Sequence, residues 1–255
     1  MSKLDRIGSL SDTQLMRLHR FFVNEFFDTP LEALGEREIN ISDKELIHQW
    51  KNVFRLKAGD DVVVLDNTGN EYMAHIAELH KEMARLRLDK GIIVKNIPQR
   101  NISLFCSLIK KDNFELVLEK GTELGVSVFI PVLSERSEKK SLNMMRARKI
   151  IQEASEQSGR GQLPELHEVK KLQEAVEEHN KMQVLALDPN GKPFDISKGF
   201  KALSEAFAVF IGPEGGWSNR ELEFFKQNNI PIYSLGHQVL RAETAAIAAS
   251  ALFLL

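Results

Sequence analysis

The sequence has a single cysteine, Cys106, among its 255 residues. One cysteine cannot form an intrachain disulfide, and it excludes a zinc site of the C-x-x-C type. The longest apolar stretch, residues 245–255, is interrupted by Ser250 and falls far short of the roughly 20 residues that span a bilayer. The residues after Met1 also lack the apolar core of a signal peptide. These absences favour a protein of the reducing cytoplasm, with no membrane partner.

The sequence also lacks a strong excess of one charge sign. Lys and Arg together number 34 and Asp and Glu number 36, so the formal net charge is −2. A positive field over the whole surface is therefore absent, and any RNA site must be a local basic patch. Hydrophobic residues make up 43% of the chain, which is enough for a complete globular core.

Residues 16–96 have the pattern of a small β-rich unit. Segments 21–23, 61–66, 71–79 and 84–94 alternate polar and apolar residues or are rich in β-branched ones, and residues 67–70 predict a hairpin turn. One helix interrupts these strands, because Ser42 and Glu45 have the spacing of a capping box before an apolar face. That face is formed by Leu46, Ile47, Trp50, Val53 and Phe54. The pattern predicts a small barrel, preceded by a loose extension over residues 1–15.

After residue 96 strands and helices alternate, which predicts a mostly parallel α/β sheet over residues 97–255. We expect a helix from Asp112, with Glu115 completing a capping box, that ends at Gly125, and another capped by Ser218 with Glu221. The expected strands are 102–108, 128–133, 182–187, 207–211 and 231–235, and the other expected helices are 141–158, 170–180 and 243–255.

Ligands of open α/β sheets bind beyond the carboxyl ends of the strands, where three loops are expected, at residues 188–191, 212–216 and 236–238. The glycine loop, residues 212–216, follows an apolar strand and precedes a capped helix. It matches neither phosphate-binding glycine motif, and Glu214 would repel a phosphate at the helix N-terminus. The loop therefore suits a small cofactor without phosphate, such as the cationic S-adenosylmethionine, although a tight turn that binds nothing remains an alternative.

The third loop leads into Arg241 and Glu243, at the start of a helix rich in alanine. Glu243 is favourable near the positive end of the helix dipole, so a solvated helix start would explain the pair. The alanines that follow predict close packing on several sides, however, and an Arg at the edge of a buried segment usually has a partner or a function. Both interpretations remain open on spacing alone.

Several long segments resemble the RsmE family, whose members methylate N3 of a uridine near the decoding site of small-subunit ribosomal RNA. The two longest are GPEGGWS at residues 212–218 and LGHQVLRAETA at residues 235–245. Shorter matching segments are residues 20–22, 52–60, 119–126, 134–137 and 153–160. The resemblance covers about residues 16–255, with Gln238 and Ala242 as departures from residues common in the family.

This resemblance implies a PUA-like RNA-binding β-barrel over residues 16–96 and a SPOUT methyltransferase domain with a C-terminal trefoil knot over residues 97–255. It also implies a homodimer. The three loops at residues 188–191, 212–216 and 236–238 are expected to hold S-adenosylmethionine together. The implied cofactor-binding residues are Leu187, Asp188, Gly212, Glu214, Gly215, Gly216, Leu235, Gly236, Leu240 and Ala245.

The resemblance gives the basic residues a function as well. Between residues 135 and 149 there are six basic and two acidic residues. Such a run is usually a solvated face. With the resemblance, we expect it to be an edge that contacts phosphates of 16S rRNA within the assembled small subunit. The residues expected to contact RNA are Arg17, Arg20, Arg55, Lys57, Lys110, Arg136 and Arg160. For catalysis, we expect Arg241 to stabilise the uracil imide anion and Glu243 to hold Arg241, without a metal.

Two other classes of protein stay open as alternatives. A protein of this fold could bind RNA without catalysis, but the intact glycine loop together with Arg241 and Glu243 argues against that. A nucleotide-dependent kinase of another α/β fold is the second alternative. The missing P-loop lysine and the presence of Glu214 argue against it.

Overall fold

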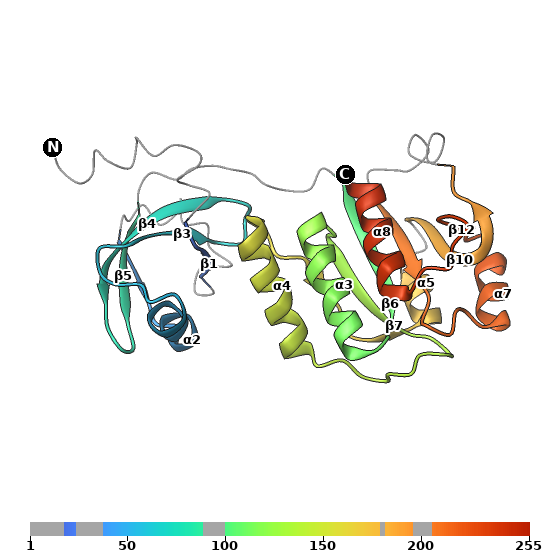
Figure 1. The fold of residues 1–255 in the computed structure, drawn as a ribbon, viewed down its shortest axis with the longest axis horizontal. Coiled ribbons are helices and arrows are strands. Elements are labelled where there is room, and N and C mark those ends of the chain that lie inside the picture. Colours follow the sequence, from blue (N-terminus) through green and yellow to red (C-terminus); the bar gives the residue numbers. More distant parts are fainter. Residues whose placement is uncertain (1–17, 24–37, 89–99, 179–181, 196–205) are drawn as a thin grey trace. The chain divides into compact units, whose positions relative to one another are not determined.

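The computed structural model of the chain describes residues 18–23, 38–88, 100–178, 182–195 and 206–255 (Figure 1). The chain divides into two compact units, one of Met1–Ile97 with Glu156–Gln162 and one of Pro98–Ser155 with Leu163–Leu255. The grouping of Glu156–Gln162 with the first unit does not follow from the sequence pattern. The extension expected at residues 1–15 and the boundary expected at residues 96–97 lie outside the described residues and stay predictions.

The first unit contains a five-stranded sheet in the order β1-β3-β4-β5-β2. Its strands are β1 (Arg20–Phe22), β2 (Glu38–Ile41), β3 (Asp61–Leu65), β4 (Glu71–Leu79) and β5 (Ala84–Leu88). The hairpin expected between β3 and β4 is confirmed, since the two strands pair antiparallel. The sequence pattern missed β2. The described strands pair along an open path, so closure of the sheet into a barrel stays a prediction.

The helix of this unit begins one residue later than expected. Asp43, not Ser42, caps α2 (Lys44–His48), because its Oδ1 accepts hydrogen bonds from the backbone N–H groups of Glu45 at 2.9 Å and Leu46 at 3.1 Å. A π-helical turn, η4 (Gln49–Val53), follows. The wider turn leaves Trp50 buried but places Val53 in solvent, where the residue is 65% exposed. The inclusion of Val53 in the apolar face was therefore wrong.

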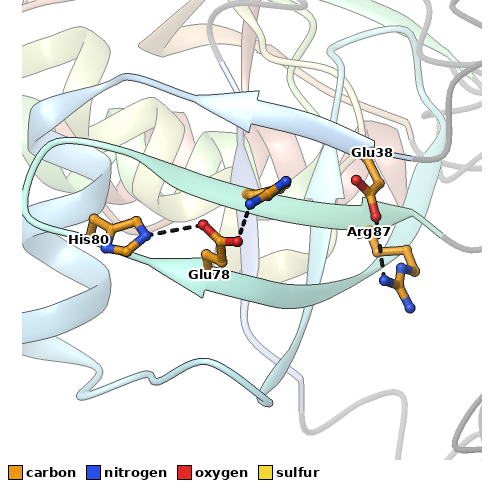
Figure 2. Close-up of polar contacts among 5 residues, drawn as sticks. Glu38, Glu78, His80 and Arg87 are labelled. Carbon is orange, nitrogen blue, oxygen red and sulfur yellow. Dashed lines mark hydrogen bonds and ion pairs between the residues drawn. The ribbon is translucent and has the colours of Figure 1, made fainter.

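The solvent-facing side of β4, β5 and β2 has charged residues of both signs. Figure 2 shows His80 beside Glu78, at 3.1 Å between Nε2 and Oε2, and Arg87 of β5 beside Glu38 of β2, at 3.4 Å. Arg85 pairs with the other oxygen of Glu78. Because the arginines of this face already have carboxylate partners, the face offers little free positive charge to a nucleic acid.

The second unit contains a seven-stranded sheet in the order β12-β10-β11-β6-β7-β8, with β9 also paired to β7. Every pairing in it is parallel, which confirms the expected parallel sheet. Its strands are β6 (Asn101–Ser107), β7 (Val128–Leu133), β8 (Glu165–Leu166), β9 (Lys170–Lys171), β10 (Gln183–Pro193), β11 (Ala206–Ile211) and β12 (Ile232–Ser234).

Helices cover both faces of this sheet. Successive side chains along a strand point to opposite faces, so they belong to two separate hydrophobic cores. The helices are α3 (Lys111–Leu124), α4 (Met144–Ser158), α5 (Leu172–Glu178), α7 (Asn219–Gln227) and α8 (Ala242–Leu254). Leu104 and Cys106 of β6 face the core formed with α3, α4 and α8, whereas Phe105 faces the core formed with α5 and α7. Figure 1 shows α3 and α8 side by side, and these two helices pack directly on each other.

Several helix ends depart from the sequence pattern. The capping box expected at Asp112 is wrong: α3 begins at Lys111 without a side-chain cap, because the Glu115 carboxylate forms ion pairs with Arg146 and Lys111 instead. Lys170–Lys171 pairs with β7 as β9, so α5 starts at Leu172. The expected start of α4 at residue 141 is also wrong, since α4 begins at Met144.

Two other helix ends are confirmed. Gly125 ends α3 at φ 106°, in the left-handed region that favours glycine. Ser218 caps α7 in a capping box with Glu221. In the described part of the chain, no helix is long and apolar enough to cross a membrane.

Candidate functional site

A cavity of about 760 Å³ lies at the carboxyl edge of the parallel sheet of the second unit. Its walls come from the segments that follow β6, β7, β11 and β12, together with the irregular part of β10 and the first turn of α8. Arg241 and Glu243 line it, and so do Lys110 and Arg136. The cavity is also lined by every residue expected to bind the cofactor: Leu187, Asp188, Gly212, Glu214, Gly215, Gly216, Leu235, Gly236, Leu240 and Ala245.

The strand order explains why a cavity forms here. β6 and β11 are neighbours in the sheet, but the chain leaves β6 for α3 on one face and leaves β11 for α7 on the other face. Loops that diverge from adjacent parallel strands leave a crevice between them, and open α/β sheets bind ligands at such points. Lys110 and the glycine loop form the two sides of this crevice.

Trp217, directly after the glycine loop, fixes the loop to the middle of β10. Its indole Nε1 donates a hydrogen bond to the backbone carbonyl of Leu187 at 2.9 Å, and the ring is buried. A Cβ at Gly212 would approach this Nε1 to 3.1 Å, so glycine allows the ring to pack against the main chain. This role of Trp217 was not predicted from the sequence, where an aromatic residue directly after two glycines was the available signal.

Two glycines leave open space where a side chain would stand. Gly216 has φ +66°, and neither Gly216 nor Gly236 would place a Cβ within 4 Å of another group. Backbone atoms at these positions can therefore approach a ligand closely. Gly215 differs, because its Cβ would lie 3.4 Å from the Arg136 side chain.

Glu214 is bound to the main chain on the opposite side of the crevice. Its Oε1 accepts a hydrogen bond from the backbone N–H of Lys110 at 2.9 Å. The carboxylate thus joins the glycine loop to the start of α3, a structural role that its position in the sequence did not predict. Its negative charge still lines the cavity.

The loop expected at residues 188–191 is instead an irregular part of β10. The pairing register between β10 and β12 shifts between Leu187 and Lys192, so these residues bulge within the strand. A Cβ at Gly191 would lie 2.6 Å from the backbone carbon of Tyr233, which restricts this position to glycine. The bulge still directs Leu187 and Asp188 to the cavity.

The expected ion pair between Arg241 and Glu243 is wrong for the described structure, which contains no such contact. Arg241 is an exposed residue with an extended backbone at the N-cap of α8. Glu243, in the first turn, points inward and is only 7% exposed. Its Oε2 is buried and has no hydrogen-bond partner among the described residues. The two side chains diverge because one lies before the helix and the other within it.

Cys106 of β6 is fully buried near the cavity but does not line it. Burial raises the pKa of its thiol, and the carboxylates of Glu214 and Glu243 raise it further. The thiol is therefore neutral over the physiological range and unsuited to act as a nucleophile.

The residues expected to contact RNA fall into different groups. Arg17 lies outside the described residues. Arg20 is half-buried and pairs with Glu71, at 3.3 Å, and burial of the Glu71 carboxyl raises its pKa in spite of this partner. Arg160 is 6% exposed, donates to the Gln162 carbonyl at 2.9 Å, and has its pKa lowered by burial to about 10. Arg20 and Arg160 thus make structural contacts within the first unit, and their contact with RNA stays a prediction.

Arg55, Lys57 and Lys110 are exposed, and no ion pair engages their side chains in the described parts of the chain. Arg136 lines the cavity, but its guanidinium Nη1 donates to the carbonyls of Gly215 at 2.9 Å and Trp217 at 3.2 Å. It is therefore already engaged with the glycine loop. No cluster of three or more His, Cys, Asp or Glu side chains that could hold a metal occurs among the described residues.

Comparisons with known proteins agree with this geometry. A family model described as an RNA methyltransferase domain matches residues 95–254, and one described as an RNA methyltransferase PUA domain matches residues 51–89. Ribosomal RNA small subunit methyltransferase E of Rickettsia conorii is 30% identical over 239 residues, which cover 92% of this chain and 95% of that protein. The enzyme of the same name from Bacillus subtilis is 29% identical, over 80% of this chain and 84% of its own.

A similar solved structure is that of ribosomal RNA small subunit methyltransferase E from Neisseria gonorrhoeae bound to S-adenosyl methionine. It superposes with a TM-score of 0.81 at 26% identity, and the match covers 92% of this chain and 96% of that one.

Proposed function

Since this chain belongs to the family of ribosomal RNA small subunit methyltransferase E, we propose that it methylates N3 of a uridine near the decoding site of 16S rRNA with S-adenosylmethionine. The observation that carries this proposal is the cavity at the carboxyl edge of the sheet. It unites the glycine loop, the third loop and the start of α8 with Lys110, Arg136 and the bulged part of β10, which come from separate parts of the sequence. The finer statement, N3 of that uridine, depends on the family resemblance.

The residues of the cavity fit S-adenosylmethionine. Gly216 and Gly236 leave open space next to the backbone, and Leu187, Leu235 and Ala245 add apolar walls. The Glu214 carboxylate places a negative charge in the lining, which suits a cationic ligand and disfavours a phosphate. When bound, the cofactor would supply an electrophilic methyl group on a positively charged sulfur.

Arg241 is the residue that we assign to the reacting base. The imide nitrogen N3 of uracil becomes a good nucleophile only after it loses its proton, so the enzyme must stabilise the resulting anion. Arg241 lines the cavity, and none of the ion pairs among the described residues involves it. Its guanidinium can donate to a uracil carbonyl oxygen, onto which the imide anion spreads its negative charge, and this leaves N3 open to the methyl group.

Glu243 has a role separate from Arg241 in this proposal. Its carboxylate lines the cavity, and one of its oxygens is buried without a donor. A buried acceptor that lacks a donor costs free energy, roughly 1–3 kcal/mol. Such a group is typical of a residue that receives its hydrogen bond from a ligand, and we assign Glu243 to that function.

The state of Cys106 favours direct transfer over a covalent route. Enzymes that add a cysteine to the base need an accessible thiolate, but burial raises the pKa of this thiol. No other cysteine is present in the chain. Attack on the methyl group by the base itself is the remaining route.

In this proposal the exposed cationic side chains contact the RNA. We assign Arg55 and Lys57 of the first unit and Lys110 at the cavity to phosphate groups of the RNA, because their side chains are exposed. The two units correspond in this proposal to a PUA-like RNA-binding domain and a SPOUT domain with a trefoil knot. The site of action is the cytoplasm, where small ribosomal subunits assemble.

A homodimer is part of the proposal. Ala242, Ala246 and Ala249 of α8 are buried against α3 and the sheet, so these alanines do help to fill the core. Beside this core-facing side of α8, Ala248 and Leu252 are half-exposed and apolar, although Leu252 also packs partly against the core. A helix that is apolar on all sides is usually buried on all sides. We expect Leu252→Glu to shift the protein to a monomer in light scattering, and a wild-type monomer at micromolar concentration would contradict the dimer.

Mass spectrometry of ribosomal RNA nucleosides tests the function directly. Small subunits that lack the modification are incubated with the pure protein and S-adenosylmethionine, and 3-methyluridine is then measured. The proposal requires this nucleoside to appear at one position only. A different methylated nucleoside would refute the N3 assignment, and the absence of any methylation would refute the proposed reaction.

A further inference from the structure

A short turn after β7, residues 134–137, contacts the glycine loop, and its residue Arg136 lines the cavity. The turn is closed by the hydrogen bond from the Ser137 N–H to the Ser134 carbonyl at 3.2 Å, and the two side-chain hydroxyls lie 2.7 Å apart. Both serines are buried. The turn is therefore a rigid support, and the two residues at its tip have fixed positions.

Both tip residues bind the segment around the glycine loop. Arg136 Nη1 donates to the carbonyls of Gly215 at 2.9 Å and Trp217 at 3.2 Å. The backbone N–H of Glu135 donates to Glu221 Oε1 at 2.8 Å. The other oxygen of Glu221 accepts from the Ser218 N–H at 2.8 Å. The turn thus holds both the glycine loop and the first turn of α7 that follows it.

We propose that Arg136 is a positioning residue, which holds the glycine loop in the conformation that binds the cofactor. This inference rests on the proposed function for the identity of that cofactor. Gly215 and Gly216 form an adjacent pair, and glycine has more backbone freedom than any other residue. Gly216 is at φ +66°, one of several conformations open to it. A guanidinium bound to the carbonyls on either side of Gly216 selects this conformation before the ligand arrives.

The physical effect is preorganisation. A loop that must be ordered on binding loses conformational entropy at that step, and this loss weakens the affinity. A loop that is already ordered avoids the loss. The contribution should therefore appear in the affinity for the cofactor, and it should be absent from the rate once the cofactor saturates the enzyme.

The neighbours of Arg136 in the sequence provide a matched control. Lys139 is an exposed cation of the same basic run, and none of the described ion pairs involves it. If the basic run contacts RNA phosphates, Lys139 should contribute to RNA affinity in a salt-dependent manner. Arg136 should contribute to cofactor affinity instead.

Calorimetric titration with S-adenosylmethionine, in the absence of RNA, tests the inference. We expect Arg136→Ala to weaken cofactor binding about tenfold, which corresponds to about 1.4 kcal/mol. Arg136→Lys should recover part of the loss, because an ammonium group can also donate to both carbonyls, as Nη1 does here, but it lies on a shorter and more flexible stem. Lys139→Ala should bind the cofactor as the wild type does.

Kinetics and RNA binding complete the test. In methyl transfer to unmodified small subunits, Arg136→Ala should raise KM for S-adenosylmethionine about tenfold and change kcat less than about twofold. Lys139→Ala should instead weaken RNA binding and reduce its salt dependence. A residue that only stabilises the fold would not separate KM from kcat in this way.

Three results would overturn the inference: unchanged cofactor affinity in Arg136→Ala, a loss confined to RNA affinity, or equal losses in kcat. If Arg136→Ala does not fold, Arg136→Met decides, since its side chain keeps an apolar stem but cannot donate to the two carbonyls. Wild-type cofactor affinity in that variant would refute the inference. A wild-type protein that binds S-adenosylmethionine but methylates no RNA would refute the proposed function. The variant titrations would remain decisive for Arg136 in that case.

Discussion

Replacement of Glu221 by Gln should destabilise the second unit, because this carboxylate is a buried acceptor for two main-chain donors. Its oxygens bind the N–H groups of Ser218 and Glu135, each at 2.8 Å, and the residue is 3% exposed. A glutamine has only one acceptor oxygen. In either orientation its NH₂ group must face one of the two backbone donors, which leaves that buried N–H without a partner.

The magnitude follows from these contacts. An unsatisfied buried donor costs about 1–3 kcal/mol, and the surviving bond loses its charge assistance, so the total is about 3 kcal/mol. For a unit of this size, about 1 kcal/mol lowers Tm by roughly 2–4 °C. We therefore expect the melting transition of the second unit to fall by roughly 6–12 °C in scanning calorimetry.

Glu223→Gln is the matched control, since Glu223 lies on the same helix, is exposed, and forms an ion pair with Lys226 at 3.8 Å. Its melting temperature should stay within about 1 °C of the wild type, because exposed ion pairs contribute little. Equal melting temperatures for Glu221→Gln and Glu223→Gln would refute the argument that the contacts of Glu221 join the turn after β7 to α7.

Three further results are expected. Arg241→Ala should lower the rate of single-turnover methyl transfer by about two to three orders of magnitude, as for loss of one oxyanion-hole donor, with little change in cofactor affinity. Arg241→Lys should recover only part of this rate, and an unchanged rate in Arg241→Ala would remove Arg241 from the mechanism. Gly236→Val should abolish S-adenosylmethionine binding in calorimetry at an unchanged melting temperature, because its side chain would enter open space; normal binding would place the cofactor elsewhere. The hydrogen bond from Arg146 holds the pKa of Glu115 below its usual 4.5, so this pair contributes stability above that pH and loses it as pH falls through the lowered pKa. Urea unfolding should therefore show Glu115→Gln less stable than wild type at neutral pH, with a difference that shrinks in acid; a constant difference would contradict the linkage.

The parts of the fold that the sequence predicted are those governed by local patterns. The strand Val128–Leu133 and the end of α3 at Gly125 were both predicted correctly, because burial imposes a period on apolar residues and a left-handed helix end favours glycine. The capping box of Ser218 and Glu221 was also predicted, since its residues lie within one turn. Errors of one residue, as at Asp43, arose where two adjacent side chains could both serve as the cap.

The candidate site could be located from the sequence for a related reason. In a parallel α/β sheet the carboxyl ends of the strands meet at one edge, so loops that follow strands must converge. The glycine loop, the third loop and Arg241 were placed together on this ground, and one cavity contains them all. What the pattern could not supply was the partner of each polar group.

Those partners were decided by the tertiary structure. Glu214 binds the N–H of Lys110, and Arg136 binds the carbonyl of Gly215, across separations of 104 and 79 residues. The burial of single polar residues could not be predicted from the sequence either. Arg160 was expected to be available to RNA, but it lies inside the first unit. A sequence determines locally which groups need a partner, by their charge and hydrogen-bonding capacity. Which partner each group meets depends on strand order and on the faces to which helices pack, and these are properties of the whole chain.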